Sequence, residues 1–245
     1  MAIIKTTTGD YEFTQKMLFP GCHVQNREVA FENLNLINRI LSNVSLHWGV
    51  AFGTLLGIVR DGDFIEWDED TDLFILEEEE NQFRDTLWNL KEVGFELIRF
   101  ERAGLYSIWR KGEYVDFYVL RKLSEQLRYT SDGCFIFEKY ITERKKINFK
   151  GIPLLVPQEV EDYFSLEYGN WQTPIRYYPP KVNFFKRLGM IMYCYFRLYS
   201  PDNIYYLWIK LLRSNDLRKF KDKCKKNGIY IDEGLKMKII QFEDM

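Results

Sequence analysis

The stretch "GTLLGIVRDGDFIEWDEDTDLFILEEEE", residues 53–80, decides how this sequence is interpreted. It places aspartates at every second position, Asp68, Asp70 and Asp72, directly before the apolar run "LFIL". Alternate residues of a strand point to the same side, so Asp70 and Asp72 share a face at the start of a buried strand. Carboxylates this close repel each other, and burial makes their charge costlier still. We therefore expect a divalent cation between them, Mg²⁺ or Mn²⁺, because these ions take carboxylate and phosphate oxygens together.

A further acid, Asp116, lies in the apolar segment "EYVDFYVL", residues 113–120. Its neighbours predict burial, and a buried carboxylate without a partner is rare. If this strand lies beside that of Asp70 and Asp72, the three carboxylates converge into a site for one or two metal ions, as phosphoryl transfer requires. The structural alternative is an ion pair between Asp116 and an arginine such as Arg110.

Gly53 and Thr54 stand where a strand predicted for residues 45–52 turns into a helix. Free backbone N–H groups at such a turn can hold a phosphate, glycine permits close approach, and threonine adds a hydroxyl. Arg60 is placed to reach the same anion. A Gly-Thr turn alone is weak evidence, and an acidic run alone is more often a solvated face. The combination of the turn, the paired acids and a third strand acid favours a catalytic site.

A calcium loop is the other simple interpretation of the acidic run. With Asp68 at position 1, Glu79 falls at position 12 of an EF-hand loop. Leu73 then stands at position 6, where that loop requires glycine, and the residues after it are strand-like. We therefore exclude a calcium loop.

Hydrophobic periodicity and turn residues predict the remaining elements. Asn26 is placed to cap the helix at 26–43, Gly94 to end the helix at 77–93 and Gly169 to end the helix at 158–169. The expected helices are residues 26–43, a helix that begins with "LLGIVR" at residue 55, residues 77–93, residues 158–169 and, with a break at Ser200-Pro201, the chain from 184 onwards. The expected strands are residues 45–52, 70–77, 95–101, 105–111, 113–120, 133–141 and 144–157. This order predicts an α+β (mixed α/β) fold, with a core sheet, flanking helices and a helical C-terminal tail.

Length and charge restrict the classes of function. The 245 residues fit one large domain with a small appendage, which we place at 1–183 for the catalytic domain and 184–245 for a helical extension packed on the core. The net charge of −2 argues against a global electrostatic grip on nucleic acid, so no nucleic-acid partner is expected. The two histidines, His23 and His47, nearly exclude a multi-histidine zinc site. Four widely spaced cysteines and the lack of a long apolar run indicate a cytoplasmic protein.

The segment from Gly53 to Leu73 resembles the signature of the LicD/fukutin family, "GTLLG-x-x-R … G-F-I-x-W-D-x-D-x-D". Asp63, between Gly62 and Phe64, is a departure of one residue. The block "VPQEVEDYFSLEYGNWQTP", residues 156–174, is similar to the later "P … YG-x-W-x-x-P" element of that family. The order of Gly-Thr, Asp-x-Asp and a third strand acid also resembles the nucleotidyltransferases of the DNA polymerase beta superfamily.

This resemblance implies a nucleotidyltransferase-like fold of the DNA polymerase beta type and a divalent metal. It also implies transfer of a phospho-substituted group, such as phosphocholine or ribitol phosphate, from a CDP-activated donor. The acceptor is a hydroxyl of a glycan, teichoic acid or lipopolysaccharide precursor, and CMP leaves as a phosphodiester forms. By matching positions, Asp70 and Asp72 bind metal, and Asp68 and Asp116 complete the metal site or take the acceptor proton. The residues that hold the donor phosphates are Gly53, Thr54 and Arg60.

The tail from Phe184 onwards interleaves aromatic and basic residues. Its spacing favours helices that pack on the core or on a second subunit, as in a homodimer, over peripheral contact with the inner face of a membrane. Two alternative functions stay open. A generic nucleotidyltransferase would move NMP from NTP and release pyrophosphate, whereas a non-catalytic nucleotide-binding module would keep the fold without turnover.

Overall fold

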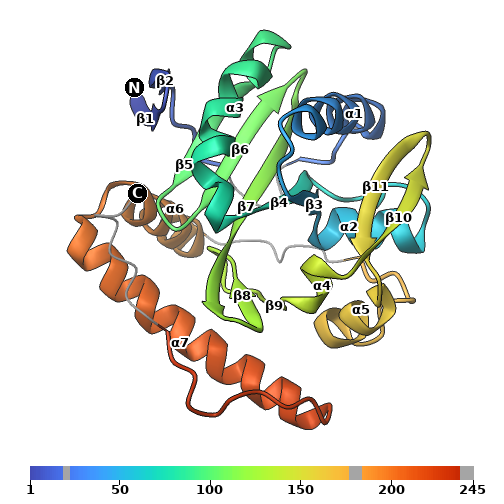
Figure 1. Cartoon of the computed structure of the whole chain (residues 1–245). Helices are drawn as coiled ribbons and strands as arrows, with labels where there is room; N and C mark the ends of the chain where they lie inside the picture. Colours follow the sequence, from blue (N-terminus) through green and yellow to red (C-terminus); the bar gives the residue numbers. More distant parts are fainter. Residues whose placement is uncertain (19–22, 177–183, 238–245) are drawn as a thin grey trace.

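The computed structural model describes residues 1–18, 23–176 and 184–237 (Figure 1). Its centre is a mixed sheet with the strand order β3-β4-β7-β6-β5, which β8 and β9 extend from β7. β4 and β7 run parallel, and the other neighbouring strands run antiparallel. The strands are β3 (Trp48–Val50), β4 (Thr71–Leu76), β5 (Glu96–Glu101), β6 (Leu105–Arg110), β7 (Glu113–Ser124), β8 (Leu127–Tyr129) and β9 (Phe135–Phe137).

Two helices, α1 (Arg27–Asn43) and α3 (Glu80–Glu92), cover one face of this sheet (Figure 1). The side chain of Asn26 accepts hydrogen bonds from two backbone N–H groups of the first turn of α1, at 3.1 and 3.3 Å, so the predicted cap is confirmed. On α3, the ring of Phe83 packs against the rings of Tyr106 and Phe117, with centroids 5.3 and 4.6 Å apart. The apolar stripes of both helices are thus buried on the sheet.

The two faces of the sheet differ in chemistry because side chains alternate along β7. Val115 and Phe117 are fully buried on the face that α3 covers. Tyr114, Asp116 and Tyr118 point to the opposite face, where they line a cavity. The face that carries the carboxylates is therefore the one that α1 and α3 leave uncovered.

The remaining elements surround this sheet. A β-hairpin at the N-terminus lies next to α3, and a second hairpin lies next to β3. The elements are β1 (Ala2–Thr6), β2 (Gly9–Phe13), α2 (Phe52–Arg60), the 3-10 turn η1 (Glu77–Glu79), α4 (Lys139–Thr142), β10 (Arg144–Phe149), β11 (Ile152–Pro157), α5 (Val160–Tyr168), α6 (Phe184–Tyr199) and α7 (Asp202–Lys226).

The mixed α+β fold class is confirmed, and several local expectations need correction. The strand expected over 144–157 is the hairpin of β10 and β11, and the strands β1, β2 and β8 were not expected. Helix α2 begins at Phe52, so Gly53 and Thr54 lie in its first turn and not in a turn before it. The strand expected over 133–141 is only β9, because the chain then forms the short helix α4. The helix expected from Glu77 begins with the 3-10 turn η1.

Both C-terminal helices contact the sheet domain. On α7, the ring of Phe220 lies 5.4 Å from that of Phe135, and Cys224 is fully buried. The junction of α6 and α7 is held by Arg102, whose guanidinium donates to the carbonyl of Ser200 at 2.8 Å. Within the described ranges, no helix has the length and apolar character needed to cross a membrane. Residues 238–245 of the expected extension lie outside the described residues.

Candidate active site

One row of side chains crosses four strands of the sheet on its uncovered face. Asp72 on β4 is the register partner of Asp116 on β7, Asp116 is paired with Ser107 on β6, and Ser107 is paired with Arg99 on β5. Partners in register lie side by side on the same face. The expectation that the Asp116 strand lies beside that of Asp70 and Asp72 is therefore confirmed.

Arg99 is the cation that faces Asp116. Its Nη2 donates to Asp116 Oδ2 at 2.6 Å, and its Nε donates to the hydroxyl of Ser107 at 2.8 Å. Burial raises the pKa of Asp116, and the nearby Arg99 opposes this shift. An arginine partner was anticipated, but Arg110 is the wrong one, because it bonds Glu32 and the carbonyl of Val93.

The aspartates before β4 carry an electrostatic cost. Burial raises the pKa of Asp70 well above its usual value, and the charges of Asp72, Asp116 and Asp68 raise it further. Burial likewise raises the pKa of Asp72, and the pKa of Asp68 rises to about 6. Clustered carboxylates of this kind occur where a cation or a proton is expected to bind.

The first turn of α2 holds Asp72 in position. The backbone N–H of Asp72 donates to Thr54 Oγ1 at 2.8 Å, and the N–H of Ala51 donates to the carbonyl of Asp72 at 2.9 Å. The Asp72 carboxylate accepts the N–H of Gly53, which lowers its pKa against the effect of burial. Phe52 begins this turn with a φ of 42°, a strained conformation for an aromatic residue. The expected free N–H at Gly53 is therefore already bonded, and the Thr54 hydroxyl is buried against β4.

Two glycines of "GTLLG" are required by close approach. A Cβ on Gly53 would stand 2.6 Å from Asp68 Oδ2, so a larger residue would displace that carboxylate. A Cβ on Gly57 would stand 2.7 Å from the carbonyl oxygen of Asp63, in the loop that leads to the aspartates. Both glycines therefore let α2 lie directly against the acidic segment.

Arg60 lies at the opposite end of α2 from Gly53, a distance of about 10 Å along the helix at ~1.5 Å per residue. Its guanidinium donates twice to Asp61, at 2.7 and 2.8 Å, and once to the carbonyl of Trp171 at 3.3 Å. Arg60 thus joins the two blocks "GTLLGIVR" and "YGNW". A contact between Arg60 and a donor phosphate stays a prediction.

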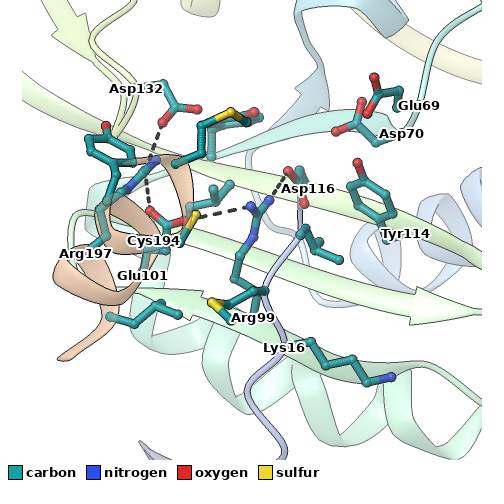
Figure 2. Close-up of a pocket in the computed structure, with 17 residues that line it drawn as sticks. Lys16, Glu69, Asp70, Arg99, Glu101, Tyr114, Asp116, Asp132, Cys194 and Arg197 are labelled. Atoms are coloured by element: carbon teal, nitrogen blue, oxygen red, sulfur yellow. Dashed lines mark hydrogen bonds and ion pairs between the residues drawn. The ribbon is translucent and has the colours of Figure 1, made fainter. Parts of the chain in front are cut away.

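A cavity of about 430 Å³ opens beside the row of charged residues (Figure 2). Asp70 and Asp116 line it from the sheet, and α6 forms another wall. Figure 2 shows Arg197 of α6 between Glu101 and Asp132; it forms an ion pair with each of them, at 3.0 Å to Asp132. The other lining residues are Lys16, Met17, Leu18, Glu69, Arg99, Leu105, Tyr114, Tyr118, Met190, Tyr193, Cys194 and Leu198.

The donor set fits a divalent cation in its chemistry. Asp116 Oδ1 is buried and has no hydrogen-bond partner among the described residues, and both burial and the charges of neighbouring aspartates raise the pKa of Asp70 and of Asp72. In the part of the chain that the structure describes, no three acidic, histidine or cysteine side chains are gathered as ligands of one ion. Mg²⁺ commonly takes one or two carboxylates and completes its shell with substrate phosphates and water, so a gathered triplet is not required.

Sequence reasoning missed the basic half of this site. Arg99 and Glu101 alternate along β5 and face the cavity together, so polar residues at every second position were the available signal. Asp132 and Arg197 lie in a loop and a C-terminal helix, far from the aspartates in sequence. No local sequence pattern predicts the ion pair between Asp132 and Arg197.

Comparison with known proteins finds one matching family and two relatives of moderate similarity. Residues 46–159 match the family described as LicD/FKTN/FKRP, nucleotidyltransferase domain. An uncharacterized protein of Rickettsia prowazekii (strain Madrid E) is 25% identical over 150 residues, 58% of this chain and 55% of that protein. One of Rickettsia typhi (strain ATCC VR-144 / Wilmington) is 25% identical over 149 residues, 58% of this chain and 46% of that protein. The chain spans about half the length of the curated relatives it matches.

Two solved structures were also similar in shape. The lincosamide antibiotic adenylyltransferase LnuA, bound to lincomycin, has a TM-score of 0.42 at 9% identity and covers 65% of this chain and 93% of its own. The antibiotic-resistance factor ANT(2'')-Ia has a TM-score of 0.40 at 11% identity and covers 83% of this chain and 99% of its own. The family match spans α2, the aspartates of the acidic segment and the strand of Asp116. Over residues 46–159, this chain is similar to the nucleotidyltransferase domain of the LicD/FKTN/FKRP family.

Proposed function

We propose that this protein is a metal-dependent transferase that moves a phospho-substituted group from a CDP-activated donor to a hydroxyl of a glycan or glycolipid precursor. The observation that carries the proposal is the placement of Asp72 and Asp116 as register partners on parallel strands, inside the segment that is similar to this family. Phosphoryl transfer needs positioning and charge neutralisation more than a histidine base, which suits a site built from carboxylates and arginines.

Of the predicted ligands Asp70, Asp72 and Asp116, one or two at a time would hold the divalent ion, and substrate phosphates and water would complete its shell. When bound, the ion would neutralise charge on the transferred phosphate and its neighbouring oxygens. Arg99 keeps one oxygen of Asp116 engaged, which leaves Oδ1 for the ion. Thr54 and Gly53 keep Asp72 against the start of β4, so its carboxylate is fixed before any ligand arrives.

The acceptor hydroxyl would attack the phosphorus that carries the substituent. The bond from this phosphorus to the oxygen shared with CMP breaks, CMP leaves, and the hydroxyl proton passes to a carboxylate. Asp68 and Asp116 are the two candidates for this carboxylate, and burial raises the pKa of both. The cavity walled by α6 has room for the acceptor beside Asp70 and Asp116.

The test is nucleotide release by the purified protein with CDP-choline, CDP-ribitol, CDP-glycerol, CTP and ATP, each with and without Mg²⁺. Metal-dependent release of CMP from one CDP-linked compound is expected, and Asp70→Asn or Asp72→Asn should abolish it. Glu66→Gln is the matched control. Glu66 is exposed and lies just before the aspartates, so this substitution removes one charge and leaves the aspartates themselves unchanged. Pyrophosphate release from CTP or ATP would instead indicate a nucleotidyltransferase, and full turnover in the Asp70 variant would refute the site.

A further inference from the structure

Helix α6 has two opposite faces, one at the cavity and one exposed to solvent. One face lines the cavity of the candidate active site through Met190, Tyr193, Cys194, Arg197 and Leu198, which recur at the spacing of one side of a helix. The other face is exposed and apolar, and its residues also recur at helical spacing: Leu188, Met192, Tyr195 and Tyr199. Helix α6 therefore turns one side to the cavity and leaves an apolar stripe in solvent.

Helix α7 also has an exposed apolar side. Its inner side is buried on the core through residues such as Ile209, Leu217 and Phe220. Its outer side exposes Ile204, Leu207 and Leu211, of which Leu207 and Leu211 are 55% and 63% accessible. The two helices pack against each other through the rings of Phe196 and Trp208, with centroids 4.9 Å apart. We call the exposed residues of both helices the docking face: Leu188, Met192, Tyr195, Tyr199, Ile204, Leu207 and Leu211.

Charge distinguishes this region from the rest of the chain. Residues 184–226 contain eleven Lys and Arg but only three Asp and Glu, although the whole chain has a net charge of −2. Along α7, the side that exposes Leu207 and Leu211 continues to the exposed residues Arg218, Asp222 and Lys225, of which two are basic and one is acidic. The docking face carries tyrosines on α6 and leucines on α7, and the mainly basic side of α7 follows its leucines along the chain. This pattern is typical of helices that lie on anionic membranes.

We propose that the docking face binds the surface of an anionic lipid bilayer. A second copy of the chain fits less well, because pairing two faces of this kind would bring two basic regions together. Exposed apolar patches bordered by polar residues mark interaction sites on soluble proteins. Since α6 is about 10 Å across, a bilayer on the docking face would lie one helix away from the cavity. The proposal does not rest on the reaction proposed above.

Vesicle flotation of the purified full chain tests this proposal, without donor or metal. The vesicles are phosphatidylcholine alone, or phosphatidylcholine with an equal amount of phosphatidylglycerol. We expect flotation with the anionic vesicles, weakened by salt, and little with the neutral ones. The double variant Leu207→Glu/Leu211→Glu should lose at least about tenfold in vesicle binding, because two exposed leucines no longer enter the interface.

The matched control is Ile3→Glu, an equally exposed apolar residue on the β1–β2 hairpin, which should float as the wild type does. Circular dichroism checks that each variant is folded. Unchanged flotation of the double variant, or no flotation of the wild type, would overturn the proposal. Sedimentation velocity tests the alternative that a second copy of the chain binds the docking face. If the wild type is a dimer that does not bind vesicles, and the double variant is a monomer, the docking face is a dimer interface and the proposal is overturned.

Discussion

Replacing Asp68 with asparagine is expected to stabilise the fold at neutral pH in the absence of metal. The Asp68 carboxyl is partly buried, and its pKa is raised from 3.8 to about 6. Its Oδ1 accepts the backbone N–H of Glu69 at 3.1 Å, a bond that the side-chain oxygen of asparagine keeps. Asparagine has nearly the same shape, so the contact of the side chain with Gly53 is also kept. The substitution therefore removes a charge while leaving the packing in place.

The sign follows from proton linkage. The folded protein binds the Asp68 proton more tightly than the unfolded chain, so its stabilising contribution is present at low pH and is lost as pH rises through about 6. The difference of about 2 pKa units corresponds to about 3 kcal/mol at ~1.36 kcal/mol per unit, an upper value because the group is partly exposed. Asp68→Asn should therefore gain up to about 3 kcal/mol at pH 8 and about half of that at pH 5.

Urea unfolding followed by tryptophan fluorescence, in EDTA at pH 8 and pH 5, measures this gain. Glu66→Gln removes a charge from an exposed position two residues earlier and should change the free energy of unfolding little at either pH. Saturating Mg²⁺ should stabilise the wild type more than Asp68→Asn, because the ion offsets the same charge. The reasoning fails if Asp68→Asn is no more stable than the wild type at pH 8, or if its gain is the same at both pH values.

Three further substitutions test the supports of the site. Gly53→Ala places a Cβ 2.6 Å from Asp68 Oδ2, so turnover should fall while circular dichroism stays unchanged; normal turnover would show that the carboxylate need not lie there. Thr54→Val leaves a buried N–H of β4 without its acceptor, and urea unfolding should show a loss of about 1–3 kcal/mol. Arg99→Met leaves Asp116 buried without its cation, which should lower the free energy of unfolding by about 3–5 kcal/mol at pH 8. The loss should be smaller at pH 5, where Asp116 is more protonated. An equal loss at both pH values would contradict the ion pair.

The acidic half of the candidate site was predictable because its signal is local. Asp68, Asp70 and Asp72 lie within five residues of one another at the start of an apolar strand, and an isolated acid in an apolar strand marks Asp116. The roles first suggested for Thr54 and Arg60 were not predictable in the same way. A hydroxyl at a strand-to-helix junction can face a ligand or the neighbouring strand, and the structure turns that of Thr54 toward β4.

By itself, the sequence determined the helices and strands of the core, the faces that they bury and the clustering of carboxylates before β4. These properties depend on periods of two and 3.6 residues, which short segments carry within themselves. Only the tertiary structure decided that Asp72 pairs in register with Asp116, that Arg99 and not Arg110 faces this acid, and that α6 walls the cavity. Register between distant strands and the docking of a helix depend on how the whole core packs, because many segments can satisfy the same local pattern.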